Sequence, residues 1–230
     1  MTHQSQQSAA AEQAVSLVTD GMLVGLGTGR TAAFAIAALC DRARAGLRIT
    51  CVPTSEASAA QARAGGLPLL DEPPADRPID LTIDGADEVE VSTLNLIKGL
   101  GAALLREKIV AACSKRLVII ADQRKRVQRL GERTPVPVEV VRFGWQTTLR
   151  RIRDLGGEPT PRLKDGAMMR TDGGNFILDC AFPVGTDMPA LERALSATVG
   201  VIESGLFIGM TDTVLIGTET GVDVLRAPGA

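Results

Sequence analysis

The sequence contains a single histidine, His3, in an amino terminus that we expect to be mobile. Serine–histidine–aspartate hydrolysis and cysteine–histidine catalysis both need a histidine in the body of the chain, and so do histidine-rich zinc sites. Acid–base chemistry in this protein must therefore come from carboxylates, lysines or cysteines.

Aromatic side chains are also scarce, at 3% of the chain, with one tryptophan and no tyrosine. Few rings are available to stack on bases, and a net charge of -2 creates no overall field that favours nucleic acid or an anionic membrane. We predict a small-molecule ligand, with neither nucleic acid nor a membrane as a partner.

The four cysteines form no Cys-x-x-Cys pair and are predicted to be buried free thiols. The longest apolar runs are too short to span a bilayer, and no long apolar signal core follows the polar residues 1–8. We therefore expect a cytoplasmic protein. A length of 230 residues allows one large domain or a main domain with a smaller companion.

Short apolar runs alternate with alanine-rich segments over the first half of the chain. The runs are predicted to be buried parallel strands, at residues 22–26, 49–52, 67–70, 79–83 and 117–121. The segments between them are predicted to be helices, at residues 31–39, 55–64 and 102–112. This alternation predicts an α/β fold with an open, mostly parallel, Rossmann-like sheet and helices on both faces.

A second, smaller α+β domain is predicted after Gly131, where two prolines punctuate the chain. We expect an extended edge at residues 138–141, helices at 144–155 and 188–198, and a hairpin of strands 167–170 and 175–180 around the turn 171–174. Residues 212–217 and 221–225 are β-like and fit either sheet. The predicted domains are residues 1–130 with 205–230, and residues 131–204.

Ligands of open α/β sheets bind beyond the carboxyl ends of the strands, and a glycine-rich turn with Thr28, Gly29, Arg30 and Thr31 follows the first predicted strand. Such a turn lets backbone N–H groups and a helix N-terminus approach a phosphate, although many turns need glycine for geometry alone. The glycines do not have the G-x-G-x-x-G spacing, so a dinucleotide is not indicated.

Three acids, Asp84, Asp87 and Glu88, follow the fourth predicted strand. They suit a hard cation such as magnesium, or they exchange protons with sugar hydroxyls in a metal-free site. The alternative is a solvated acidic turn, with Glu88 the member most expected to be merely at the surface.

A second glycine-rich entry to a helix offers Lys98 and the backbone of Gly99 and Gly101 to an anion, with Glu107 a turn or two inside the helix. On the other interpretation, Glu107 and its charged neighbours form a solvated helix face. Lys125 follows the fifth predicted strand in a basic cluster, where most members are expected to be solvated and one lysine is able to reach a substrate phosphate or carboxylate.

Taken together, these segments resemble the type A ribose-5-phosphate isomerase family across nearly the whole chain. The matching stretches are residues 25–29 (GLGTG), 53–55 (PTS), 83–89 (IDGADEV), 98–99 (KG) with 104–109 (LLREKI), 171–175 (TDGGN) and 205–207 (GLF). Several such stretches in the right order are far more specific than any one of them.

The resemblance implies an isomerase, without metal or cofactor, that interconverts ribose 5-phosphate and ribulose 5-phosphate through an enediolate in the non-oxidative pentose phosphate pathway. It implies that Glu107 moves the proton between the two carbons. Ring opening, the hydroxyl protons and the enediolate charge fall to Asp84, Asp87 and Lys98, and substrate binding to Thr28, Thr31 and Lys125. A homodimer or homotetramer with a ferredoxin-like second domain is also implied.

The sequence departs from the family pattern at six positions: Gln7 and Ser8 stand where lysines are common, Arg30 and Arg124 for serine, Leu100 for glycine and Ser204 for histidine. We hypothesise that Arg30 replaces the missing amino-terminal cation in phosphate binding, and that Leu100 narrows the site. The competing interpretations are a diverged isomerase for another sugar phosphate and a non-catalytic sugar-phosphate sensor on the same fold.

Overall fold

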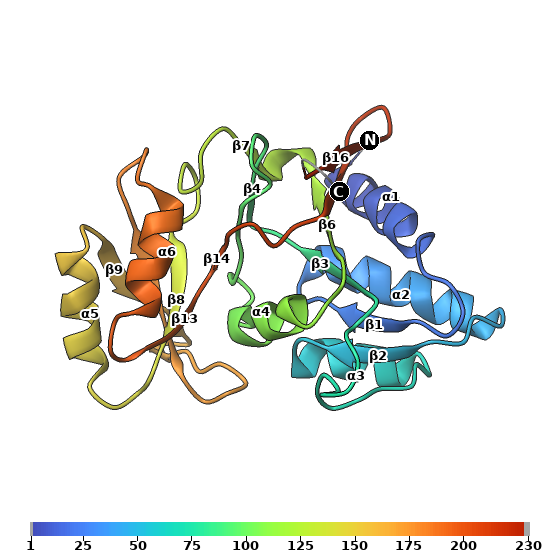
Figure 1. Ribbon diagram of the computed structural model, residues 1–230, viewed down its shortest axis with the longest axis horizontal. Coiled ribbons are helices and arrows are strands. Elements are labelled where there is room, and N and C mark those ends of the chain that lie inside the picture. Colours follow the sequence, from blue (N-terminus) through green and yellow to red (C-terminus); the bar gives the residue numbers. More distant parts are fainter. Residues whose placement is uncertain (1, 228–230) are drawn as a thin grey trace. The chain divides into compact units, whose positions relative to one another are not determined.

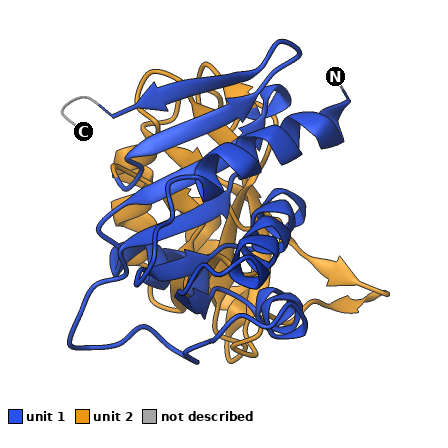
Figure 2. Ribbon diagram, turned by 90° about the vertical axis from the view of Figure 1, so that its right-hand side faces the viewer, with its two compact units in different colours: residues 1–86, 106–125, 210–230 blue, residues 87–105, 126–209 orange. Residues whose placement is uncertain are grey.

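The computed structural model describes residues 2–227, which divide into two compact units (Figures 1 and 2). Unit 1 takes the residues up to 86, residues 106–125 and those from 210 onward, and unit 2 takes residues 87–105 and 126–209. The predicted domains assign residues 87–105, 126–130 and 205–209 to the first domain instead, and their outermost residues, 1 and 228–230, lie outside the described residues.

Unit 1 is built on a six-stranded sheet with the order β16-β15-β6-β3-β1-β2, in which only the pair β15–β16 is antiparallel. The strands are β1 (Leu23–Leu26), β2 (Thr50–Pro53), β3 (Leu81–Gly85), β6 (Leu117–Asp122), β15 (Thr213–Gly217) and β16 (Val222–Arg226). The helices are α1 (His3–Val15), α2 (Arg30–Arg44), α3 (Glu56–Ala64) and α4 (Leu104–Ala112), and the division between the units falls inside α4. The predicted open, mostly parallel sheet is confirmed.

Helices cover both faces of this sheet because its buried strands are apolar on each side. Val24 and Leu26 of β1 pack in the core that contains α1 and α2, which lie side by side in Figure 1. Leu23, on the opposite face, packs with Val110 of α4.

The segment 67–70, predicted as a strand, forms only an isolated bridge between Leu69 and Cys51 of β2. Cys51 donates its N–H to the carbonyl of Pro68 and accepts the N–H of Leu70, both at 2.9 Å. The next donor along β2 would be Pro53, which has no N–H, so the ladder stops there.

The expectation of a mobile amino terminus is wrong for residues 3–8, because α1 begins at His3. The hydroxyl of Thr2 caps the helix by accepting the N–H of Ser5 at 3.2 Å. The polar composition hides this helix from sequence reasoning, although Gln6 and Gln7 are both buried.

Unit 2 contains a four-stranded antiparallel sheet with the order β13-β8-β12-β9, and helices α5 and α6. Its elements run in the order β8 (Val136–Val140), α5 (Trp145–Asp154), β9 (Glu158–Pro161), β12 (Phe176–Ala181), α6 (Met188–Ser196) and β13 (Val201–Ser204). This βαββαβ arrangement is the predicted ferredoxin-like fold. Side chains of α5 and α6 share a core with Val136, Val138 and Val140 of β8.

The remaining elements of unit 2 are short. A second sheet has the order β14-β5-β4-β7, formed by β4 (Glu88–Glu90), β5 (Leu96–Ile97), β7 (Arg126–Val127) and β14 (Leu206–Phe207). A hairpin pairs β10 (Leu163–Lys164) with β11 (Ala167–Met168), and the single-turn helix η1 (Gln123–Lys125) follows β6 in unit 1.

Two strand predictions for the smaller domain are wrong in detail. Residues 138–141 were predicted at an edge because proline lacks an N–H, but β8 is an interior strand in which Pro137 uses its carbonyl to accept the N–H of Gly205 at 2.7 Å. The N–H of Thr171 donates to the carbonyl of Asn175 at 3.0 Å, and the predicted hairpin keeps one antiparallel bridge, between Arg170 and Phe176, whereas β11 pairs with β10.

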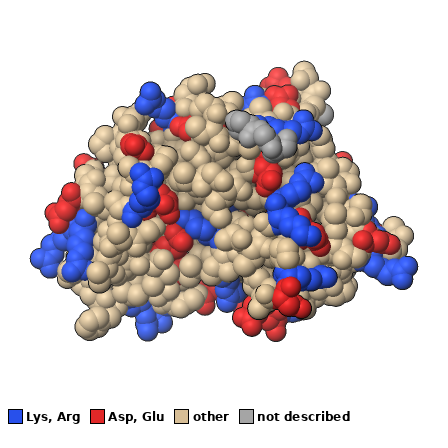
Figure 3. All heavy atoms as spheres, in the orientation of Figure 1, with Lys and Arg blue, Asp and Glu red and all other residues tan. Residues whose placement is uncertain are grey.

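Across residues 2–227 no helix is long and apolar enough to cross a membrane. All four cysteines are free thiols, as predicted, although Cys113 is only half-buried. Acidic and basic side chains are interspersed over the face shown in Figure 3.

Candidate active site

The predicted site residues are shared between the two units. Unit 1 carries Thr28, Gly29, Arg30, Thr31, Asp84, Glu107 and Lys125, and unit 2 carries Asp87, Lys98, Gly99 and Gly101.

Asp84 holds the glycine-rich turn that follows β1. It lies at the end of β3, is 1% exposed, and its Oδ1 accepts the N–H of Thr28 at 3.0 Å and the N–H of Gly85 at 2.7 Å. A side chain on Gly27 would place its Cβ 2.1 Å from this oxygen, so only glycine permits the approach. The structure thus brings Asp84 and Thr28 together.

A cluster of four hydroxyls lies beneath the same turn. The hydroxyl of Thr28 is 2.7 Å from that of Thr54, 2.8 Å from that of Ser55 and 3.3 Å from that of Ser58. Ser58 donates to the carbonyl of Gly27 at 2.6 Å, so the cluster fixes the turn. Three neighbours use the hydrogen-bonding capacity of one hydroxyl, which makes the Thr28 side chain a support for the turn.

The turn leads directly into the N-terminus of α2. Gly29 is the N-cap residue, with φ +100° and no side-chain capping bond, and Arg30 next to it is exposed. Thr31 is half-buried in the first turn of the helix. Unsatisfied amides at a helix N-terminus attract anions, and an arginine beside them adds a full positive charge.

Glu107 is 4% exposed on α4, while its neighbours Arg106 and Lys108 are half-buried. Arg106 pairs with Glu56 of α3 at 2.8 Å, on a part of the helix open to solvent. The interpretation of these residues as a solvated helix face is therefore wrong for Glu107, which is the buried carboxylate of this helix.

The acidic turn, residues 84–88, is not a solvated surface turn. The expectation that Glu88 lies merely at the surface is wrong. Glu88 is 1% exposed and accepts the backbone N–H groups of Gly131, Arg133 and Thr134, each at 2.7 Å. These donors lie more than forty residues away in the sequence, so no local pattern announces the contact. Glu88 has a structural role in unit 2.

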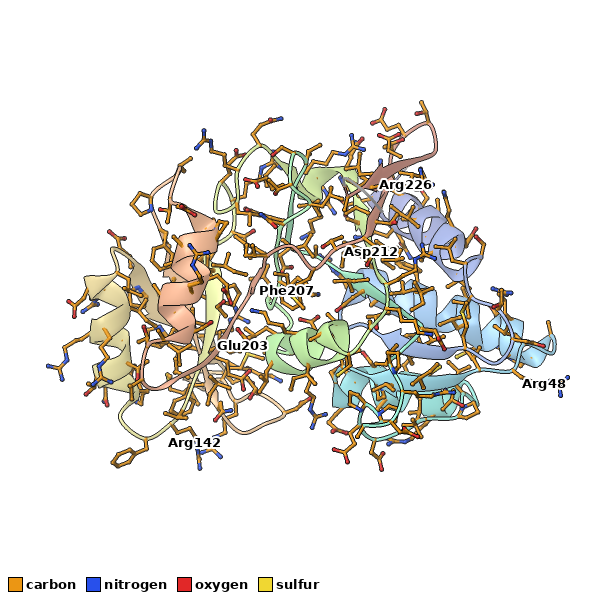
Figure 4. All side chains as sticks on the ribbon, viewed as in Figure 1. Arg48, Arg142, Glu203, Phe207, Asp212 and Arg226 are labelled. Atoms are coloured by element: carbon orange, nitrogen blue, oxygen red, sulfur yellow. The ribbon has the colours of Figure 1, made fainter. Side chains whose placement is uncertain are left out.

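Lys98 is 2% exposed at the end of β5. Its Nζ lies 5.4 Å from the ring centroid of Phe207 on β14, a cation–π distance, and Phe207 is labelled in Figure 4. The backbone N–H of Lys98 donates to the carbonyl of Gly205 at 2.9 Å. Burial of an ammonium group costs free energy unless interactions within the protein replace its lost hydration. Ionisable groups in such environments are often found at functional sites.

The turn after Lys98 is held by Asp87. The half-buried Asp87 accepts the N–H of Leu100 on its Oδ2 at 2.9 Å. Gly99 adopts φ +107°, and Leu100 and Gly101 are exposed. Three predicted residues of unit 2, Lys98, Gly99 and Gly101, thus lie in one segment, the Lys98 turn, defined as residues 98–101, and Asp87 is hydrogen-bonded to it.

Sequence reasoning missed a network at the end of β6. Asp122 is fully buried and accepts Nε2 of Gln7 at 2.9 Å, together with Nε and Nη2 of Arg124, each at 2.9 Å. Burial alone would raise the pKa of Asp122, but the hydrogen bonds from Arg124 and Gln7 outweigh it and hold the pKa below its usual range. Gln7 and Arg124, which both depart from the family pattern, therefore bind the same carboxylate. The half-buried Lys125 follows in η1.

Among residues 2–227, no group of three or more histidine, cysteine, aspartate or glutamate side chains is arranged to hold a metal ion. Asp84 and Glu88 instead direct their carboxylates to backbone N–H groups. The acids of this turn are used as hydrogen-bond acceptors for the backbone.

Comparisons with a family model, with curated proteins and with solved structures all indicate the same family. The family model described as ribose 5-phosphate isomerase A (phosphoriboisomerase A) matches residues 50–221. The ribose-5-phosphate isomerase A of Gloeobacter violaceus is 53% identical over 221 residues, covering 96% of each chain.

Two solved structures are similar over nearly the whole chain. The ribose 5-phosphate isomerase A of Methanocaldococcus jannaschii is 39% identical with a TM-score of 0.92, covering 98% of this chain and 100% of its own. A D-ribose-5-phosphate isomerase in complex with phospho-erythronic acid is 36% identical with a TM-score of 0.94, at the same coverage.

Proposed function

Because the chain belongs to the ribose 5-phosphate isomerase A family, we propose that it interconverts D-ribose 5-phosphate and D-ribulose 5-phosphate through an enediolate. This reaction belongs to the non-oxidative pentose phosphate pathway. The similar solved structure with phospho-erythronic acid supports a sugar phosphate as the ligand.

The observation that carries the proposal is the burial of Glu107, at 4% exposure, on a helix whose other charged side chains reach solvent. In the proposed reaction Glu107 removes the C2 proton of the open-chain aldose and delivers a proton to C1. A positioned general base contributes about 100- to 10,000-fold to such a step.

Three other ionisable groups supply what the base alone lacks. The ammonium of Lys98 stabilises the negative charge of the enediolate, and one preorganised donor of this kind is worth about 3 kcal/mol. Asp84 and Asp87 exchange protons with the sugar hydroxyls and assist ring opening.

Substrate binding is proposed for the turn and helix that follow β1. Gly29, Arg30 and Thr31 offer the N-terminus of α2 and a cation to the phosphate, and Lys125 contributes a second cation. Gly99 and Gly101 offer backbone groups from the Lys98 turn.

The test is to incubate the protein with ribose 5-phosphate in deuterated water that contains EDTA. We expect NMR to show ribulose 5-phosphate with deuterium at C1, and deuterium at C2 of the aldose as the reaction reverses. Absence of ketose would contradict the proposed activity, and loss of activity with EDTA would favour magnesium at the acidic turn.

We further propose that the enzyme works in the cytoplasm as a homodimer or homotetramer, with a small sugar phosphate and no nucleic acid or membrane as its ligand. The free thiols support the cytoplasm, and the nearly equal numbers of basic and acidic side chains, 25 and 27, support a ligand other than nucleic acid or a membrane. Sedimentation equilibrium at micromolar protein concentration distinguishes the two oligomers from a monomer.

A further inference from the structure

Two carbonyl groups of the Lys98 turn point to the same side chain. The oxygens of Gly99 and Leu100 both accept hydrogen bonds from Nη1 of Arg162, at 2.8 Å and 3.1 Å. Arg162 lies between β9 and β10, more than sixty residues further along the chain.

The guanidinium of Arg162 is itself fixed by Asp179 of β12. Nε donates to Oδ2 at 2.9 Å and Nη2 donates to Oδ1, so the pair is bidentate. The side chains of Arg162 and Asp179 are only 11% and 23% exposed, which protects the pair from screening by salt. Asp179 balances the charge of the guanidinium, so Arg162 orients the turn without adding net charge to it.

The direction of these carbonyls determines where the neighbouring N–H groups point. In a trans peptide the N–H points opposite to the C=O, and no peptide bond among the described residues is cis. Since the Gly99 carbonyl is turned toward Arg162, the N–H of Leu100 points away from it and donates to Asp87 at 2.9 Å. The Leu100 carbonyl turns the N–H of Gly101 away from Arg162 in the same manner.

The backbone of this segment needs such a restraint. Gly99 has φ +107° and Ala102 has φ +59°, a left-handed conformation that costs free energy for alanine. The side chain of Leu100 is 47% exposed and supplies little packing. Polar contacts therefore hold the turn.

We propose that Arg162, fixed by Asp179, is a positioning residue of the isomerase. It orients the peptides of residues 99–101 and, through the N–H of Leu100, the carboxylate of Asp87, without touching the substrate itself. This inference rests on the proposed function, because it takes Asp87 as a group that exchanges protons with the sugar.

The experiment measures kcat, KM and the inhibition constant of phospho-erythronic acid for Arg162→Ala and Arg162→Lys. For Arg162→Ala, kcat is expected to fall about 10- to 100-fold with KM within about threefold, since small misplacements of catalytic groups have effects of this size. The acid, whose carboxylate resembles the enediolate, should bind more weakly by the same factor as kcat/KM falls. Lysine cannot reproduce the planar fork, so Arg162→Lys should restore activity only in part.

A double-mutant cycle separates positioning from a general structural role. In an Asp87→Ala background, Arg162→Ala should cost less than about threefold, because the group that it positions is gone. An undiminished loss in that background, or a change confined to KM, would overturn the inference. If Arg162→Ala does not fold, Asp179→Asn provides the milder variant, with a smaller loss of kcat in the same direction expected and an unchanged kcat contradicting the inference.

The exposed ion pair of Arg44 with Asp41 provides the matched control, and Arg44→Ala should keep the wild-type kcat. The two proposals fail differently. The proposed function is contradicted if the wild-type protein does not isomerise ribose 5-phosphate, whereas the role of Arg162 is contradicted if the wild type is active and the Arg162 variants match it.

Discussion

The turn of residues 25–29 in unit 1 and the Lys98 turn in unit 2 each donate a backbone N–H to an aspartate. Thr28 donates to Asp84 at 3.0 Å, and Leu100 donates to Asp87 at 2.9 Å. The supports beneath them differ, because neutral hydroxyls hold the first turn and the ion pair of Arg162 with Asp179 holds the second.

The difference matches the task proposed for each turn. A neutral support leaves the positive potential of the α2 N-terminus available for a phosphate. Charge-assisted bonds are stronger and fix peptide directions more firmly, which suits the Lys98 turn, where the exposed side chain of Leu100 supplies little packing and no helix N-terminus is proposed to bind the phosphate. The comparison can be tested by changing one turn and then the other.

The largest effect is expected from changing either of the two aspartates to its amide in a single variant. Asp84→Asn and Asp87→Asn keep an oxygen that accepts the turn N–H but cannot exchange protons as a carboxylate does. We expect kcat to fall about 100- to 10,000-fold in each, with little change of KM, in steady-state assays. A loss in only one variant would show that the two aspartates do not share this role.

Gly27→Ala should disturb the turn of unit 1 and leave the Lys98 turn intact. The new Cβ would meet Asp84 Cα at 2.5 Å, so backbone has to move, and we expect kcat to fall about 100-fold. Gly173→Ala is the control, because its Cβ would meet its nearest neighbours at 3.5 Å or more, which is ordinary contact. Equal activity of Gly27→Ala and the wild type would contradict the role of this close approach.

Arg30→Ala tests whether the exposed arginine at the start of α2 binds the phosphate. We expect KM for ribose 5-phosphate to rise about 10-fold with kcat unchanged. A loss of affinity of this size corresponds to the free energy of one charge-assisted hydrogen bond. Arg44→Ala, on the same helix, should leave KM as it is. An unchanged KM for Arg30→Ala would show that this arginine does not replace the missing amino-terminal cation.

Thr28→Val removes one member of the hydroxyl cluster at nearly constant shape. The hydroxyls of Thr54, Ser55 and Ser58 would lose a hydrogen-bond partner. We therefore expect the free energy of unfolding, measured by urea denaturation, to fall by about 1–3 kcal/mol. Thr28→Ser keeps the hydroxyl and should lose much less. Similar losses in both variants would mean that the methyl group and not the hydroxyl matters.

Two buried carboxylates, one in each unit, should respond oppositely to pH. The pKa of Asp122 is lowered, so its stabilisation is present above its unfolded-state value and is lost as pH falls through the folded-state value. Burial raises the pKa of Glu139 more than hydrogen bonds from Asn175 and Thr171 lower it. Its contribution is therefore present below the ordinary value of 4.5 and is lost as pH rises through the folded-state value.

Urea unfolding across a pH series checks both signs. At pH 7 we expect Asp122→Asn to be less stable than the wild type and Glu139→Gln to be more stable, with both differences shrinking in acid. A Glu139→Gln variant that is less stable at pH 7 would contradict the raised pKa.

Local patterns predicted most of the larger sheet and the ferredoxin-like unit, because apolar runs and turn residues act over a few positions. The prediction of a strand at residues 67–70 was wrong, because the proline that ends its ladder lies on the neighbouring strand β2, at residue 53. Helix α1 was not predicted, because its polar side chains give little apolar signal, although Gln7 is buried and bonded to Asp122.

The site residues were predictable as residue types, but their partners were not. Nothing near Glu88 in the sequence indicates that residues 131–134 supply its three N–H donors. Arg162 likewise acts on carbonyls more than sixty residues earlier in the chain. Such contacts depend on tertiary packing, which one sequence does not encode in any local pattern.

The most direct test of the proton-transfer role assigned to the buried carboxylate of α4 is deuterium incorporation by Glu107→Gln. We expect this variant to bind phospho-erythronic acid while its rates of ketose formation and of deuterium incorporation from solvent both fall at least about 100-fold. Wild-type rates of deuterium incorporation in Glu107→Gln would contradict the account.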